Sequence, residues 1–286
     1  MVKIIADSTC DLSKELIKKY DISIVPLHII CENEDYLDGF SIGPEQIFEW
    51  SEKNKTTPKT SAVGIAEARD CIAPLAEAGN EVVCISISDE LSTTGNIMRL
   101  VAEEINEEVG KELVRVVNSA NLSTGIGHLV IEAAEMVKDG SSATEIVDAI
   151  EKMVPHVRSS FVVDTLTYLH RGGRCSGLAA LAGGALKLHP KIVVKNGKLD
   201  VDKKYRGSMK HVLIQYTHEM LDQFANARTD RVFITHALCD AEIVKAVHEY
   251  ISELGIFDEI IITTAGGVIS SHCGPGTLGV LFVEKE

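Results

Sequence analysis

The sequence predicts an α/β fold of two domains, with an N-terminal mostly parallel sheet flanked by helices and a C-terminal α/β domain built on a mixed sheet. Short apolar runs alternate with amphipathic helical patterns along the chain, which is typical of β-α-β units. The apolar runs in the first half are continuous, as in parallel strands that are buried on both faces. The length of 286 residues corresponds to about two domains of ~150 residues each.

The first half alternates between strand and helix patterns. Apolar residues repeat every three or four positions in the helical segments, as Ile146, Ile150 and Met153 do, whereas the strand segments are short, continuous apolar runs. We expect strands at 2–6, 81–88 and 113–118, an extended stretch at 22–30, and helices at 13–20, 62–78, 96–108, 127–138 and 144–154. We place the boundary between residues 159 and 160, which gives domains 1–159 and 160–286.

The second half predicts a mixed sheet. We expect strands at 161–164, 191–195, 198–204, 231–235, 259–264 and 278–284, helices at 165–170, 178–187, 208–225 and 241–254, and a loop at 171–174. Asn196-Gly197 favours a two-residue antiparallel hairpin because both residues tolerate positive φ. The helix at 178–187 is apolar almost all round, so it either packs closely in the core or lines an apolar cavity.

Composition narrows the classes of function. The net charge of −14 disfavours a nucleic-acid partner, and with it a DNA-binding regulator, and also disfavours docking on an anionic membrane. No apolar run approaches the ~18–20 residues that span a bilayer, and Asp7 comes too early for a signal peptide. The seven cysteines form no C-x-x-C pair, so we expect no metal site and a reducing, cytoplasmic location.

Polar residues gather where predicted strands end and helices begin. Such stretches follow three strands, at 7–11, 91–96 and 119–125, and Thr60-Ser61 precedes another helix. The carboxyl ends of parallel strands share one edge of the sheet, where ligands bind, and helix N-termini favour anions. The stretches therefore predict a site for a carboxylate or a phosphate, although each one alone fits an ordinary helix cap.

Motifs of common enzymes are missing or incomplete. Gly125 and Gly127 lack the third glycine of a dinucleotide fingerprint, and the sequence has no G-x-S-x-G, Walker A or H-E-x-x-H segment. Two other residues are candidate anion ligands. His272 lies in a Gly-rich segment, 266–276, that predicts a bend, where it either donates to an anion or bonds to local backbone. Arg174 follows two glycines and either binds an anion or stays solvated beyond a helix cap.

Several of these segments resemble the DegV family, in order and over the full length of the chain. The matching segments are Asp7-Ser8-Thr9-Cys10-Asp11-Leu12, Pro26-Leu27, Lys59-Thr60-Ser61 with Glu67, Ser88-x-x-Leu91-Ser92-x-Thr94, Asn118-Ser119 with Gly125 and Gly127, Leu166-x-Tyr168-Leu169-x-x-Gly172-Gly173-Arg174, and His272-x-Gly274-Pro275-Gly276. Each piece is short, but the series as a whole is specific.

The resemblance implies a DegV-like fold that binds a long-chain fatty acid, such as palmitate, stearate or oleate, between its two domains. It assigns the carboxylate to Thr60, Ser61, Ser92 and His272, with Thr94 adjacent, and the acyl chain to an apolar tunnel. It implies neither catalysis by the chain itself nor a cofactor. Some members are lipid-binding subunits of bacterial fatty acid kinase, so a kinase subunit is the implied partner, and the absent Walker A segment agrees with this.

Two positions depart from the family pattern. Thr93 stands where the family has glycine, and Gly95 stands where it usually has an aromatic residue. A β-branched residue at 93 is awkward if that position needs positive φ, and Gly95 removes bulk beside the expected head group. The alternative hypothesis is an enzyme acting on a small phosphorylated or carboxylated metabolite. It would use Ser92 or Cys273 with His272, and Arg174 as an anion clamp.

Overall fold

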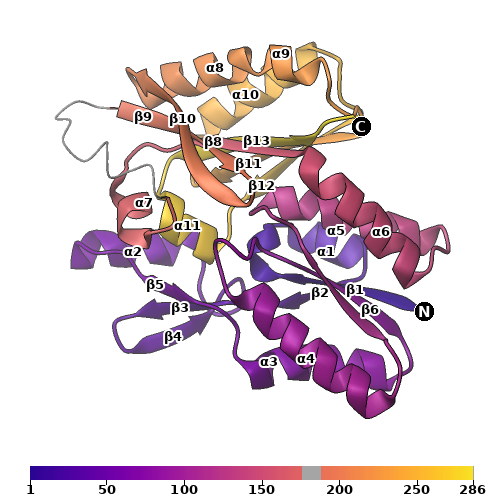
Figure 1. Cartoon of the computed structure of the whole chain (residues 1–286). Helices are drawn as coiled ribbons and strands as arrows, with labels where there is room; N and C mark the ends of the chain where they lie inside the picture. The colour runs from indigo at the N-terminus through magenta and orange to yellow at the C-terminus, as the bar shows by residue number, and fades with distance from the viewer. Residues whose placement is uncertain (176–187, 286) are drawn as a thin grey trace.

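The computed structural model describes residues 1–175 and 188–285 and has the predicted α/β architecture (Figure 1). Its first sheet is parallel throughout, in the order β2-β1-β6-β7. These strands are β1 (Val2–Asp7), β2 (Ile22–Val25), β6 (Glu81–Ser86) and β7 (Val114–Asn118). Side chains of β1 enter two different cores, Ile5 on one face and Ile4 and Ala6 on the other. Burial on both faces explains why these strands are continuously apolar.

Helices cover both faces of the parallel sheet. Residues of α3 (Ile65–Glu77) and α4 (Thr94–Val109) share a core with one face, and residues of α5 (Thr124–Lys138) and α6 (Ala143–Met153) share a core with the other. The short helices η1 (Ser8–Cys10) and α1 (Lys14–Lys19) connect β1 to β2, and η2 (Val154–His156) connects α6 to the second sheet.

The second sheet is mixed, in the order β10-β9-β8-β13-β11-β12, and only β11 and β12 pair in parallel. Its strands are β8 (Val157–Val162), β9 (Leu188–Lys195), β10 (Lys198–Arg206), β11 (Arg231–Ala237), β12 (Glu259–Thr264) and β13 (Thr277–Val283). The predicted hairpin is confirmed, with φ of 50° at Asn196 and 77° at Gly197. The outer helices are α8 (Met209–Glu219), α9 (Leu221–Phe224) and α10 (Ala241–Glu253).

Helix α5 lies between the two sheets (Figure 1). It touches β1 and β6 on one side and β8 and β13 on the other. Ile126, Leu129 and Val130 are buried around its circumference, because a helix with a sheet on each side has no solvent face in its buried turns. The core around α5 is therefore continuous between the two halves of the chain. The expected boundary between residues 159 and 160 falls within β8.

A third, small sheet is a feature that the sequence did not predict. It is antiparallel, with order β4-β3-β5, and consists of β3 (His28–Cys31), β4 (Glu34–Leu37) and β5 (Lys59–Ser61). The extended stretch expected at 22–30 is therefore wrong as one element, because β2 and β3 belong to different sheets. Helix α11 (Gly267–Cys273) packs against β3 and β5, and helices α2 (Pro44–Asn54) and α7 (Thr167–Gly172) pack against α11.

Two other helix predictions need correction. The segment expected to bend, 266–276, forms helix α11 over its central seven residues. The long helix expected at 208–225 is divided at Met220 into α8 and α9. The apolar helix expected at 178–187 lies outside the described residues.

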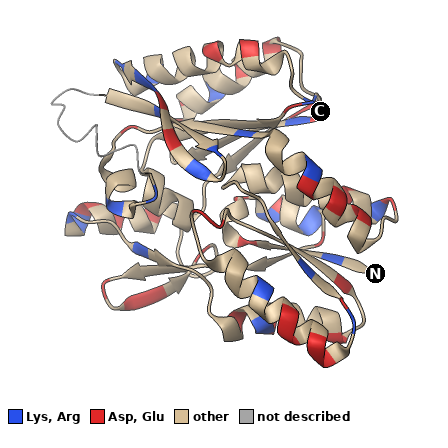
Figure 2. Cartoon of the chain, viewed as in Figure 1, with Lys and Arg blue, Asp and Glu red and all other residues tan. Residues whose placement is uncertain are grey.

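Charge is concentrated away from the centre of the molecule. Helices α4 and α6 carry several acidic residues, whereas α11 carries no Lys, Arg, Asp or Glu (Figure 2). Within the described ranges, no helix is long and apolar enough to cross a membrane, and no group of His, Cys, Asp and Glu has the arrangement of a metal site. The charge of −14 therefore resides mainly on the periphery.

Candidate functional site

A cavity of about 60 Å³ brings together five of the six residues that the sequence singled out, namely Thr60, Ser61, Ser92, Arg174 and His272. We call it the hydroxyl cavity. Its volume is several times that needed by one water molecule. The five residues come from β5, the turn before α4, the segment after α7, and α11. The five residues do not all come from the edge of the parallel sheet, because Thr60 and Ser61 lie on the small antiparallel sheet.

His272 is a part-buried polar residue of the cavity. It occupies the last turn of α11, and its Nε2 lies 2.8 Å from Thr60 Oγ1. Its Nδ1 has no hydrogen-bond partner among the described residues and packs on Gly172, where a Cβ would collide with it. Burial, and then the positive charge of Arg174, lower the pKa of His272 to about 4. The imidazole is therefore neutral near pH 7.

This environment gives a direct spectroscopic prediction. In the protein without ligand, the His272 ring is expected to titrate with a midpoint near 4, measured from its NMR signals over a pH series. Because the Arg174 charge contributes to the lowered pKa, Arg174→Ala should raise that midpoint. A midpoint near the ordinary value of ~6.5 would show that the ring is solvated and that the cavity is built differently.

Ser92 is oriented by its neighbour Thr94, the sixth predicted residue. Their hydroxyl oxygens lie 2.9 Å apart, and the Thr94 backbone N–H donates to Ser92 Oγ over 3.3 Å. Thr94 is fully buried and does not line the hydroxyl cavity. Thr94 therefore holds the Ser92 hydroxyl group from outside the cavity.

Both departures from the family pattern have structural explanations. Thr93 has a φ of −84°, so a β-branched residue is unstrained there. Gly95 is buried at the start of α4, where a Cβ would lie only 2.5 Å from Asp89 Oδ1. Asp89 in turn pairs with Arg99 over 2.8 Å. Gly95 thus makes room for the Asp89 carboxylate, and Gly95 itself does not line the hydroxyl cavity.

Ser61 and Arg174 lie at the exposed side of the cavity. Ser61 Oγ donates to the Ala62 carbonyl over 3.1 Å, and Arg174 Nη1 donates to the Gly172 carbonyl over 2.7 Å. Both bonds involve exposed groups, so water or a ligand can replace them at little cost. Arg174 supplies the only formal charge among the residues lining the hydroxyl cavity in the described part of the chain.

The strand that carries Thr60 and Ser61 is braced by a histidine. His28 pairs with Ser61 in the β3–β5 register, and its ring lies 2.9 Å from Asp35 and 2.8 Å from Glu67. Burial lowers the pKa of His28, but the bonds to Glu67 and Asp35 outweigh this effect, so the pKa is raised overall. The ion pairs therefore form most fully at slightly acidic pH.

The two ion pairs of His28 have a predictable dependence on pH. Their contribution to stability is fully present below the unfolded-state pKa of histidine, ~6.5, and is lost as pH rises through the higher pKa of His28 in the folded state. The free energy of unfolding lost in His28→Gln, measured with urea, should therefore be larger at about pH 6 than at about pH 9. Equal losses at the two pH values would mean that the His28 ring is neutral throughout.

An apolar cavity of about 50 Å³ adjoins the hydroxyl cavity. The two share Leu122, Leu199, Ile269 and His272 in their walls. Other walls come from β8, β11, β13, α7 and the segment between β12 and α11, and include Phe161, Leu169, Ala237, Ala265 and Leu281. Sequence reasoning missed these residues, because they lie far apart in the chain and each one looks like an ordinary core residue.

The hydroxyl groups in the walls of the apolar cavity are already bonded within the protein. Ser123 donates to Asp11, Thr277 donates to the Cys273 carbonyl, and Thr235 lies 2.9 Å from Thr263 Oγ1. The hydroxyl cavity, which is lined mainly by neutral polar groups and apolar side chains, thus adjoins a cavity whose walls are mostly apolar. The arrangement suits a molecule with a polar or anionic head and an apolar tail.

The geometry disfavours the nucleophilic roles considered for Ser92 and Cys273. Burial raises the pKa of the Cys273 thiol to about 12, so it is not a thiolate near pH 7. Ser92 is paired with Thr94, whereas His272 is paired with Thr60. Among the described residues, neither candidate nucleophile is hydrogen-bonded to His272, as an activated nucleophile would be to its base.

Comparison with known proteins identifies relatives of the whole chain. Residues 1–285 match the family model described as "Uncharacterised protein, DegV family". A DegV domain-containing protein of Deinococcus radiodurans is 33% identical over 281 residues, which cover 98% of this chain and 97% of that protein. A solved DegV family protein from Thermus thermophilus, described as binding fatty acid, has a TM-score of 0.90 at 27% identity and 99% coverage of both chains. A stearic-acid-binding protein from Eubacterium ventriosum has a TM-score of 0.86 at 25% identity, covering 100% of this chain and 99% of that one.

Proposed function

This chain belongs to the DegV family, and on that premise we propose that it binds one long-chain fatty acid, such as palmitate, stearate or oleate. The observation that carries the proposal is the hydroxyl cavity opening beside the apolar cavity, with shared walls. The fatty-acid ligands described for the Thermus and Eubacterium proteins support it. We propose that the ligand lies between the domains 1–159 and 160–286 expected from the sequence, because residues from both halves of the chain line the two cavities.

We assign the carboxylate head group to Thr60, Ser61, Ser92 and His272. Thr94 orients Ser92, and Arg174 supplies a positive charge at the exposed side. Hydrogen bonds from neutral donors to a carboxylate are stronger than those between neutral groups. They offset the cost of removing the carboxylate from water, while burial of the acyl chain contributes about 0.8 kcal/mol per CH₂. A neutral His272 can donate one such bond without a buried positive charge of its own.

We propose that the protein carries the fatty acid without transforming it, and that a separate kinase subunit phosphorylates the carboxylate. The exposed position of Arg174 and Ser61 supports access to the head group from outside. On this proposal the fatty acid is the ligand, and the function needs no cofactor. The cysteine pattern of the sequence supports the cytoplasm as the location.

The proposal is tested on the purified protein. Denaturing extraction followed by mass spectrometry is expected to release a long-chain fatty acid in near one-to-one ratio. After delipidation, added oleate or palmitate should raise the melting temperature, because a ligand that binds only the folded state stabilises it. Empty extracts together with an unchanged melting temperature would contradict fatty-acid binding.

A further inference from the structure

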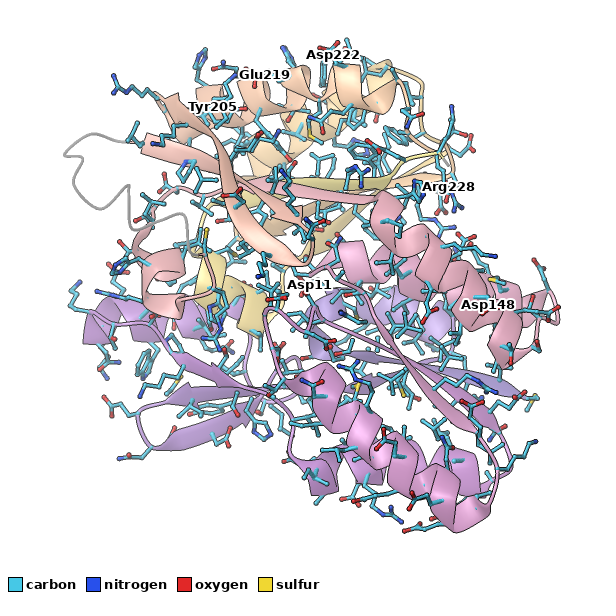
Figure 3. The ribbon with its side chains drawn as sticks, in the orientation of Figure 1. Asp11, Asp148, Tyr205, Glu219, Asp222 and Arg228 are labelled. Atoms are coloured by element: carbon cyan, nitrogen blue, oxygen red, sulfur yellow. The ribbon has the colours of Figure 1, made fainter. Side chains whose placement is uncertain are left out.

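Two buried carboxyl groups lie outside the hydroxyl and apolar cavities and have no role in the function proposed above. Asp11 follows η1 and Asp38 follows β4, and their residues are only 5% and 1% exposed. Asp11 lies in the middle of the molecule, between the two large sheets (Figure 3). Burial raises the pKa of Asp38 to about 6 and that of Asp11 well above its ordinary range. Because burying such groups is costly, their partners indicate what they do.

Both carboxyl groups hold the start of α11. The Gly266 N–H donates to Asp11 Oδ1 over 2.8 Å, and the Gly267 N–H donates to Asp38 Oδ1 over 2.7 Å. The first N–H groups of a helix have no partner within the helix, and its positive end favours carboxylates. Because Gly266 and Gly267 have no side chains, the two carboxyl groups can come close to the backbone at the start of α11. A Cβ on Gly267 would lie 3.0 Å from Asp38 Oδ1 and 2.5 Å from Ile29 Cδ1.

The second oxygen of each carboxyl group bonds to another element. Asp38 Oδ2 accepts from Ser8 Oγ over 2.8 Å, and Asp11 Oδ2 accepts from Ser123 Oγ over 2.5 Å. Ser123 lines the apolar cavity and precedes α5 with φ 52° and ψ −145°, an uncommon and costly conformation for a residue with a side chain. Asp11 therefore joins Ser123, which lines the apolar cavity, to the start of α11, whose residues Ile269 and His272 line the same cavity.

We propose that Asp11 and Asp38 are positioning residues for the ligand site. They fix the start of α11, and so the place of His272 at its other end, and Asp11 also fixes the strained wall residue Ser123. The assignment of His272 to the ligand rests on the proposed function, whereas the placement of α11 by the two carboxyl groups does not. Neither residue touches the ligand itself, because neither lines the two cavities.

The test compares Asp38→Ala with Asp38→Asn, and Asp11→Ala with Asp11→Asn, in the full chain. Alanine removes the acceptor from the N–H of α11, whereas asparagine keeps an oxygen in nearly the same place. The first measurement is the NMR titration of the His272 ring without ligand. The alanine variants should move its midpoint upward from about 4 as the ring becomes solvated, and the asparagine variants should stay close to the wild type.

The second measurement is the preference for oleate over methyl oleate. We expect the alanine variants to lose about tenfold of that preference, and the asparagine variants to keep most of it. Folded alanine variants with an unchanged His272 midpoint would overturn the inference, whatever happens to binding. If Asp11→Ala does not fold, the Asp38 pair decides the question alone.

A loss of stability by itself would weaken oleate and methyl oleate equally, and would leave the native His272 midpoint in place. A wild-type protein that binds neither compound, but whose His272 midpoint still moves in the alanine variants, would support the positioning and overturn the proposed ligand. The two failures are therefore distinguishable.

Discussion

Replacing Ser92 and His272 together with alanine is expected to weaken binding of oleate by about 100-fold and to change binding of methyl oleate by less than about threefold. On the proposed assignment, each removed group donates to a charged acceptor, and such bonds contribute about 1.5–3 kcal/mol. The ester keeps the acyl chain but lacks the charge, so it makes little use of these donors. Isothermal titration calorimetry on delipidated protein measures both affinities.

Ser271→Ala is the matched control for this experiment. Ser271 is the neighbour of His272 on α11, is buried, and lines neither cavity. Its removal should leave the preference for the acid unchanged, even if stability falls slightly. Equal losses for acid and ester in the double variant would show that the head group binds elsewhere.

Replacing Phe233 with alanine is expected to lower the free energy of unfolding by about 3–5 kcal/mol. Phe233 on β11 is fully buried in the core around α5. Its ring packs edge-on against His128 of that helix, with centroids 4.8 Å apart. A domain is stable by only about 5–15 kcal/mol, so the loss is a large fraction of the total. Urea unfolding followed by circular dichroism measures it.

Phe40→Ala provides the same chemical change at a surface position. Phe40 is 66% exposed, and a surface substitution of this kind changes stability by about 0.5 kcal/mol or less. A loss at Phe233 no larger than that at Phe40 would mean that the two large sheets do not pack together through α5 as described.

The α/β layers were predictable because their signal is local. The strands and most helices around the two large sheets carry periodic apolar residues, and the Asn196-Gly197 hairpin is encoded in two adjacent residues. Helix α2 and strand β5 were missed because α2 buries only Ile47 and Ser51 and β5 has three residues. Neither offers the repeated apolar pattern on which such predictions depend.

Helix α11 shows a different limit. Its sequence contains Gly267 and small or β-branched residues that favour other conformations in isolation, so a bend was the reasonable expectation. The helix forms because Asp11 and Asp38, more than 200 residues away in the chain, accept its first N–H groups. Local propensity contains no information about partners at that separation.

The sequence predicted residues that share a cavity, but it did not predict how that cavity is built. Motif resemblance singled out Thr60, Ser92 and His272, and the structure brings them to one cavity. The cavity does not lie only at the edge of the parallel sheet, as we expected, because Thr60 is on the antiparallel strand β5. The apolar walls came only with the tertiary structure, because nothing distinguishes Phe161 or Leu281 in sequence from other core residues.

The sheet-helix-sheet arrangement around α5 also has a consequence for how the molecule comes apart. Helix α5 is buried by a sheet from each half of the chain, so the loss of either sheet would expose it to solvent. Heating should therefore produce one calorimetric transition rather than two, and a chain cut at residue 159 should not retain a native first half. The ligand would then bind to a body that melts as a unit, and its stabilising effect should reach strands at both ends of the molecule.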